Sequence, residues 1–129
     1  MTPSRCTLLL SFALSMATIP AWSASALNTL DPDKDGTVDL AEAKGAAANL
    51  FDRLDRDHDG TLDARELGRR VGKKEFAAAD PDKDGTLDKT EYLGLVDTCF
   101  RAANPDNDGT LDARELRAPA GRALTKLLM

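Results

Sequence analysis

Four twelve-residue segments repeat one spacing of oxygen-bearing side chains along this chain of 129 residues. The segments are DPDKDGTVDLAE, DRDHDGTLDARE, DPDKDGTLDKTE and NPDNDGTLDARE, which begin at Asp31, Asp55, Asp80 and Asn104. Carboxylate or amide side chains recur at positions 1, 3, 5, 9 and 12, and alternate side chains turn inward when such a segment wraps around an ion. Hard cations such as calcium take about six to eight oxygen ligands. We therefore expect four metal-binding loops, numbered 1 to 4 in chain order.

The spacing matches the EF-hand pattern, in which position 7 offers a main-chain oxygen and a glutamate at position 12 offers two oxygens. Glycine stands at position 6 of every loop, where the chain reverses with a positive φ. The candidate ligands of loop 1 are Asp31, Asp33, Asp35, Thr37, Asp39 and Glu42, and those of loop 2 are Asp55, Asp57, Asp59, Thr61, Asp63 and Glu66. The candidates of loop 3 are Asp80, Asp82, Asp84, Thr86, Asp88 and Glu91, and those of loop 4 are Asn104, Asp106, Asp108, Thr110, Asp112 and Glu115.

The aspartate at position 9 has two roles open to it. It stands three residues before the glutamate, as the N-cap and N3 residues of a helix capping box do. It also stands where an EF-hand loop binds its ion directly or through water. The sequence leaves capping and ligation equally open for this residue in all four loops.

The connections between the loops predict shared helices. Successive loops are separated by only 12 or 13 residues, enough for one helix of about 18 Å and not for two. Apolar residues at helical spacing fill the first connection, from Leu40 to Leu54, and the third, from Tyr92 to Phe100. The middle connection contains Gly68 and Gly72, which predict two short helical turns with a bend near Val71. Because a bent connection returns loop 3 to loop 2, we expect loop 2 to pair with loop 3 and loop 1 to pair with loop 4.

The hydrophobic residues outside the connections complete the predicted core. Position 8 is always apolar and is expected to anchor each loop to the core or to its partner loop. A last helix is predicted over Ala113 to Ala118, before Pro119, with the tail offering Leu124, Leu127 and Leu128 to the core. The predicted fold is all-α, a compact EF-hand bundle of about three helices with four metal loops.

The first 26 residues have the features of a secretory signal. Arg5 precedes a mostly apolar run from Leu8 to Ile19, and Ala24-Ser25-Ala26 forms a small-residue cleavage site. A buried N-terminal helix is the other interpretation of this stretch. We expect a secreted, periplasmic product with one domain over residues 27–129, no membrane attachment, and Cys99 as its single cysteine, packed as a small apolar residue.

Charge and residue types bear on the class of function. The chain has 22 acidic residues and a formal net charge of −5, and only Asp52, Glu75 and Asp97 of those acids lie outside the loops. Nucleic acid is an unsuitable partner because its phosphates would face these carboxylates with no basic stripe to offset them. The chain has one histidine and shows no nucleophile beside a base, so we expect no enzymatic activity.

The loops also indicate which cation they suit. Loops 1 to 3 each present five carboxylates, and Coulomb attraction grows with ion charge, which favours a trivalent ion of calcium-like size. Loop 4 begins with neutral Asn104 and is expected to be the weakest site. Proline at position 2, as Pro32, Pro81 and Pro105, fixes φ and removes an amide donor, which stiffens those loops.

Proline at position 2, aspartate at position 9, and three loops that begin with Asp before one that begins with Asn closely resemble the lanmodulins, periplasmic lanthanide-binding proteins of methylotrophic bacteria. The resemblance covers essentially all of residues 27–129. It implies selective binding of lanthanides in loops 1 to 3, a weak fourth site, and a link to lanthanide uptake or to a lanthanide-dependent dehydrogenase. Loop 2 departs from the pattern, with Arg56 in place of proline and His58, expected to be solvated, at position 4.

The crowded acids also predict that folding is coupled to metal. Clustered carboxylates repel one another without an ion, and a core with few aromatic residues offsets this poorly, so we expect a loose apo state that becomes helical on binding. A periplasmic calcium buffer or sensor is the alternative, and monomeric behaviour is expected in either case. An adhesion module similar to dockerins fits less well, since these usually carry two repeats and an Asp at position 12.

Overall fold

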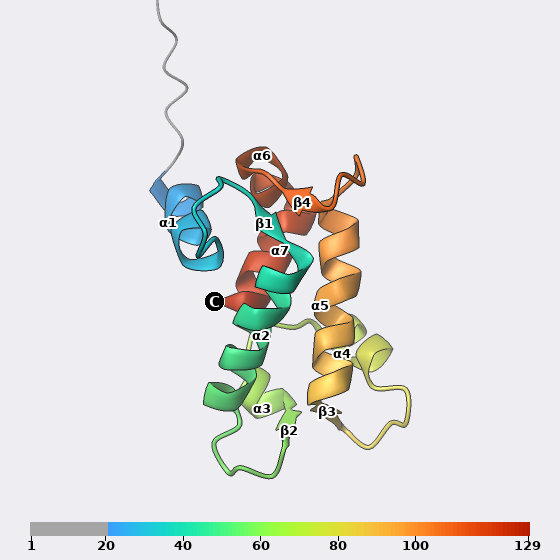
Figure 1. Ribbon diagram of the computed structural model, residues 1–129. Coiled ribbons are helices and arrows are strands. Elements are labelled where there is room, and N and C mark those ends of the chain that lie inside the picture. The colour runs from blue at the N-terminus through green and yellow to red at the C-terminus, as the bar shows by residue number, and fades with distance from the viewer. Residues whose placement is uncertain (1–20) are drawn as a thin grey trace, which may run out of the picture.

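Two fifteen-residue helices, α2 (Leu40–Leu54) and α5 (Lys89–Ala103), form the frame of the fold and pack against each other (Figure 1). The computed structural model describes residues 21–129, with side chains from Ala26 onward. The predicted signal, residues 1–26, lies outside the described residues except for its last six, which begin helix α1 (Ala21–Leu30). The two long helices are the first and third connections predicted above.

Each long helix buries one apolar face because its hydrophobic residues recur every three or four positions. In α2 the buried side chains include Leu50 and Phe51, and in α5 they include Tyr92, Val96 and Phe100. The rings of Phe51 and Tyr92 meet at 5.8 Å between centroids and are tilted by 55°. This contact joins the end of α2, before loop 2, to the start of α5, after loop 3.

Short antiparallel strands join the loops in pairs. Strand β1 (Val38–Asp39) of loop 1 pairs with β4 (Thr110–Leu111) of loop 4, and β2 (Thr61–Asp63) of loop 2 pairs with β3 (Thr86–Asp88) of loop 3. The apolar residues at position 8 lie opposite each other in both pairs and are fully buried; they are Val38 with Leu111, and Leu62 with Leu87. The predicted pairing of the loops is confirmed, and the pairs lie at opposite ends of α2 and α5 (Figure 1).

The middle connection bends where its glycines stand. Helix α3 (Ala64–Leu67) ends at Gly68, whose φ of 57° lies in the left-handed region, and Gly72 is the N-cap of α4 (Lys73–Ala79). The two predicted helical turns are therefore present. Helix α4 has no fully buried residue, and its Phe76 is only partly buried, so this ring contributes less to the core than the buried rings of Phe51 and Phe100.

The chain after loop 4 forms two helices. Helix α6 (Ala113–Arg117) is the predicted last helix, but Pro119 starts a further one, α7 (Pro119–Leu128). Proline suits the first turn of a helix because the N–H it lacks has no intrahelical partner there. The expected tail is thus a helix, and it buries Leu124, Leu127 and Leu128 against α5 and α2.

Together α2, α5 and α7 make the predicted all-α bundle of about three main helices, with the shorter helices attached to the loops. Cys99 is a free, partly buried thiol packed against the core, and burial raises its pKa. Within residues 21–129, no helix is both long enough and apolar enough to cross a bilayer.

Candidate metal centres

The first residue of loop 1 organises the loop backbone. Asp31 is buried, with 6% of its surface exposed, and its two carboxylate oxygens accept N–H groups of Asp35 at 3.2 Å and Gly36 at 2.8 Å. Asp55 and Asp80 accept the corresponding N–H groups in loops 2 and 3. These bonds hold the backbone of each loop curved around its first residue.

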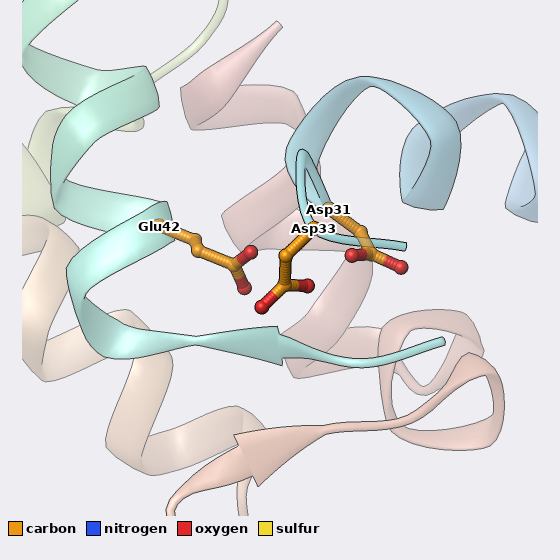
Figure 2. A group of neighbouring side chains, drawn as sticks. All are labelled: Asp31, Asp33 and Glu42. Atoms are coloured by element: carbon orange, nitrogen blue, oxygen red, sulfur yellow. The ribbon is translucent and has the colours of Figure 1, made fainter. Parts of the chain in front are cut away.

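Three carboxylates converge within each loop. In loop 1 an oxygen from each of Asp31, Asp33 and Glu42 lies within 4.8 Å of the other two, and Figure 2 shows the side chains approaching one another from the loop and from the start of α2. The equivalent positions converge in the next two loops, as Asp55, Asp57 and Glu66, and as Asp80, Asp82 and Glu91. In loop 4 the converging carboxylates are those of Asp106, Asp108 and Glu115.

Two of the glutamates carry an oxygen that has no protein partner. Oε1 of Glu42 and Oε1 of Glu115 are buried and accept no hydrogen bond. A buried carboxylate oxygen without a partner is costly, and a bound cation would satisfy it. Since position 12 of an EF-hand loop supplies two oxygens to the ion, the residues present fit a hard cation.

The position 5 aspartates of loops 1 to 3 lie outside the convergent groups. Asp35 Oδ1 instead accepts both the N–H and the hydroxyl of Thr37, each at 2.8 Å. Asp59 with Thr61, and Asp84 with Thr86, repeat this turn with the same distances. The candidate ligand Thr110 bonds Asp108 in loop 4 as well. The side chains at position 7 therefore fix the turn, which leaves their main-chain oxygens as the only candidate ligands there.

The aspartates at position 9 cap helices. Asp39 Oδ1 accepts the N–H of Glu42 at 2.7 Å, while Glu42 Oε2 accepts the N–H of Asp39 at 2.8 Å, and this is a complete capping box. The same reciprocal pair starts α3, α5 and α6, with Asp63, Asp88 and Asp112 as the N-caps. None of the four belongs to a convergent carboxylate group, so capping is the interaction that the described structure gives them.

Left-handed backbone occurs at two positions of every loop. Glycine at position 6 has φ between 83° and 90°, as predicted, and a Cβ there would meet nothing within 4 Å, so backbone conformation alone requires glycine. Position 4 also has a positive φ, although its residues are Lys34, His58, Lys83 and Asn107. The sequence pattern did not reveal this second reversal, because lysine is not a typical residue for it.

Loop 4 differs at its first residue. Asn104 is as buried as the aspartates at the same position, with 6% of its surface exposed, but its Oδ1 accepts no hydrogen bond. An amide has one acceptor oxygen where a carboxylate has two, so it cannot accept the two N–H groups on separate oxygens as Asp31 does. Loop 4 therefore has one negative charge fewer and a less organised turn.

Loop 2 differs at its second residue. The N–H of Arg56 donates a 3.1 Å hydrogen bond to Oε1 of Glu66, the oxygen equivalent to the unpartnered one in Glu42. Proline at position 2 of the other loops has no N–H to offer. The sequence showed that the donor was present, but not that Glu66 accepts it. His58 is exposed, as expected.

Carboxylate crowding alters the acidities in loop 1. The contact with Asp31 raises the pKa of Asp33. Burial also acts to raise the pKa of Asp31, but hydrogen bonds from Gly36 and neighbouring groups outweigh it and leave the pKa below its ordinary value. Burial, followed by the nearby aspartates, raises the pKa of Glu42, and the pKa of Glu115 rises for the same reasons. Negative charge is thus concentrated where the ion would lie.

Comparison with protein families identifies the motif. A family model described as EF hand matches residues 47–71 and 73–96, which contain loops 2 and 3 with the helices on either side. The chain therefore contains EF hands, which are metal-binding motifs, at loops 2 and 3. Loops 1 and 4 lie outside the matched residues but repeat the capping box, the left-handed glycine and the carboxylate convergence. A search of curated proteins gave no match.

Proposed function

We propose that this EF-hand protein binds trivalent lanthanide ions selectively in loops 1 to 3, with loop 4 as a weak site. The observation that carries the proposal is the convergence of three carboxylates within 4.8 Å in each of these loops, with two further acidic side chains in the same twelve residues. The attraction between a fixed set of carboxylates and an ion scales with the ion's charge, so a trivalent ion of calcium-like size gains about half as much again as calcium does.

The biological setting that we propose follows the resemblance to the lanmodulins. A signal over residues 1–26 would place the mature chain in the periplasm, where it would bind lanthanides for uptake, storage or delivery to a lanthanide-dependent dehydrogenase. Ion binding would also drive folding, because it relieves the repulsion among the loop carboxylates. The raised pKa of Asp33 supports this, since its largest cause is the contact with the neighbouring carboxyl group of Asp31.

A periplasmic calcium buffer or sensor is the second candidate. The observation that favours it is the conventional loop geometry, which includes the position 12 glutamate, the left-handed glycine and the paired strands found around calcium in EF hands. In loop 2 the positive charge of Arg56 also reduces the advantage of a trivalent ion.

A competition titration separates the two candidates. The mature chain, residues 27–129, is titrated with lanthanum chloride in a chelator buffer that sets the free ion, with and without millimolar calcium chloride. The proposal predicts half-saturation at a free lanthanum concentration at least about a thousand-fold below that of calcium, which corresponds to a difference of about 4 kcal/mol. Equal half-saturation by the two ions would contradict it and leave the calcium buffer.

A further inference from the structure

Loop 2 contains a hydrogen bond that none of the other loops can form. In loops 1, 3 and 4 the residue at position 2 is proline, so no main-chain N–H is available there. In loop 2 the N–H of Arg56 bonds Glu66 Oε1 at 3.1 Å, across ten residues of sequence. Both oxygens of Glu66 are therefore occupied, because Oε2 accepts the N–H of Asp63 at 3.2 Å.

The equivalent oxygen is buried without a partner in two of the three loops that have proline at position 2. Oε1 of Glu42 in loop 1 and Oε1 of Glu115 in loop 4 are buried and have no hydrogen-bond partner. These oxygens gain a partner when an ion enters, whereas Glu66 exchanges one partner for another. A hydrogen bond to a charged group is stronger than one between neutral groups, so the exchange has a cost.

We infer that the Arg56 N–H competes with the cation for Glu66 Oε1 and makes loop 2 the weakest of the three loops that begin with aspartate. Position 2 thereby sets the affinity of a loop through its main-chain N–H, which proline lacks. This inference rests on the proposed function only in its choice of lanthanum as the ion, since the competition applies to any cation that Glu66 binds.

The charge of the Arg56 side chain affects the cation affinity of loop 2 separately from the N–H, so a test must remove it. A hollow of about 340 Å³ beside loop 2 is lined by Arg56, Asp57, Asp63, Arg65 and Glu66. The positive charge of an arginine at this hollow lowers the attraction for any cation. A variant that removes the side chain and keeps the N–H measures this effect by itself.

The test compares three substitutions at one position. Arg56→Ala and Arg56→Gly both remove the charge and keep the N–H, but glycine leaves the loop more flexible than alanine does. Arg56→Pro removes the charge and the N–H together. Each mature variant is titrated with lanthanum chloride, and loop loading is followed by nuclear magnetic resonance of the amides of Gly36, Gly60 and Gly85, which report on loops 1, 2 and 3.

The inference predicts that Gly60 responds at a higher free lanthanum concentration than Gly36 and Gly85 in the original protein. It predicts similar half-saturation of loop 2 in Arg56→Ala and Arg56→Gly, and half-saturation at about ten-fold lower lanthanum in Arg56→Pro. The reciprocal variant Pro81→Ala gives position 2 of loop 3 a main-chain N–H. In this variant the Gly85 amide is expected to reach half-saturation at a higher free lanthanum concentration than in the original protein. An Arg56→Pro value within about two-fold of Arg56→Ala would overturn the inference.

An even progression from glycine through alanine to proline would also overturn it, because loop stiffness would then explain the series. Repeating the titrations with calcium chloride separates this inference from the proposed function. The ratio of the half-saturation concentrations of loop 2 in Arg56→Pro and Arg56→Ala tests the role of the N–H, whichever ion is used. The ratio of the half-saturation concentrations of lanthanum and calcium in the original protein tests lanthanide selectivity.

Discussion

The hydroxyl of Tyr92 donates a 2.8 Å hydrogen bond to the main-chain oxygen of Leu127. Tyr92 follows Glu91, the last residue of loop 3, and Leu127 lies near the end of α7. Both residues are buried, so the bond fixes the C-terminal helix to the helix that leaves a metal-binding loop.

Tyr92→Phe is expected to destabilise the fold by about 1–2 kcal/mol, because it leaves a buried carbonyl oxygen without its donor. Urea unfolding of the calcium-loaded protein measures the change. Thr98→Ala is the matched control, since its hydroxyl also bonds a carbonyl oxygen, that of Gly94, but at an exposed site within one helix. If Tyr92→Phe lowers the free energy of unfolding no more than Thr98→Ala does, the hydrogen bond between the two helices contributes little to stability.

The phenol of Tyr92 should ionise at a higher pH than an exposed tyrosine does. Burial raises the pKa of Tyr92 to about 12, with a smaller opposing effect from Arg70. Since this is above the unfolded value of about 10, the contribution to stability is complete below pH 10 and is lost as pH rises through about 12. Absorbance at the tyrosinate band of the calcium-loaded protein measures it directly, because Tyr92 is the only tyrosine. Ionisation near pH 10 in the folded protein would contradict the buried position.

Gly121→Ala should separate α7 from α6. A Cβ at Gly121 would overlap the carbonyl oxygen of Glu115, a loop 4 residue, so one of the two helices must move. The expected loss is about 1–3 kcal/mol in urea unfolding, with weaker ion binding in loop 4. Gly94→Ala is the control, because a Cβ there meets nothing within 4 Å and alanine should stabilise α5 by up to about 1 kcal/mol. The same sign of change in both variants would refute the close approach of the two helices.

Asn104→Asp should make loop 4 resemble loops 1 to 3. The carboxylate supplies the second acceptor oxygen that the amide lacks and adds a negative charge. Isothermal titration calorimetry with lanthanum should then give about four tight ions where the original gives about three, as the charge counts imply. Asp80→Asn is the reciprocal change and should remove one tight ion. An unchanged stoichiometry in both variants would show that position 1 does not decide the strength of a loop.

Much of this fold is predictable because its strongest signals are local. The spacing of acids and glycines identifies the loops, and the apolar residue at position 8 predicts buried contacts such as that of Val38 with Leu111. The bend at Gly68 and Gly72 follows from backbone preference, and it decides which loops pair.

The parts that sequence did not reveal depend on distant partners or on ambiguous residues. Pro119 could either end α6 or begin a new helix, and only the burial of the leucines in α7 favours the second. The bond from Tyr92 to Leu127 spans 35 residues, and no pattern relates the two. The sequence likewise contains the Arg56 N–H without indicating that Glu66 is its acceptor.

The proposed function makes lanthanides the ions that complete this fold. Far-ultraviolet circular dichroism of residues 27–129 against buffered free lanthanum, and separately against calcium, tests it most directly. We predict low helicity without metal and a rise to the helical content of the bundle at free lanthanum concentrations at least about a thousand-fold below those that calcium requires. Unchanged helicity with lanthanum, or a full response to calcium at equal concentration, would contradict the claim.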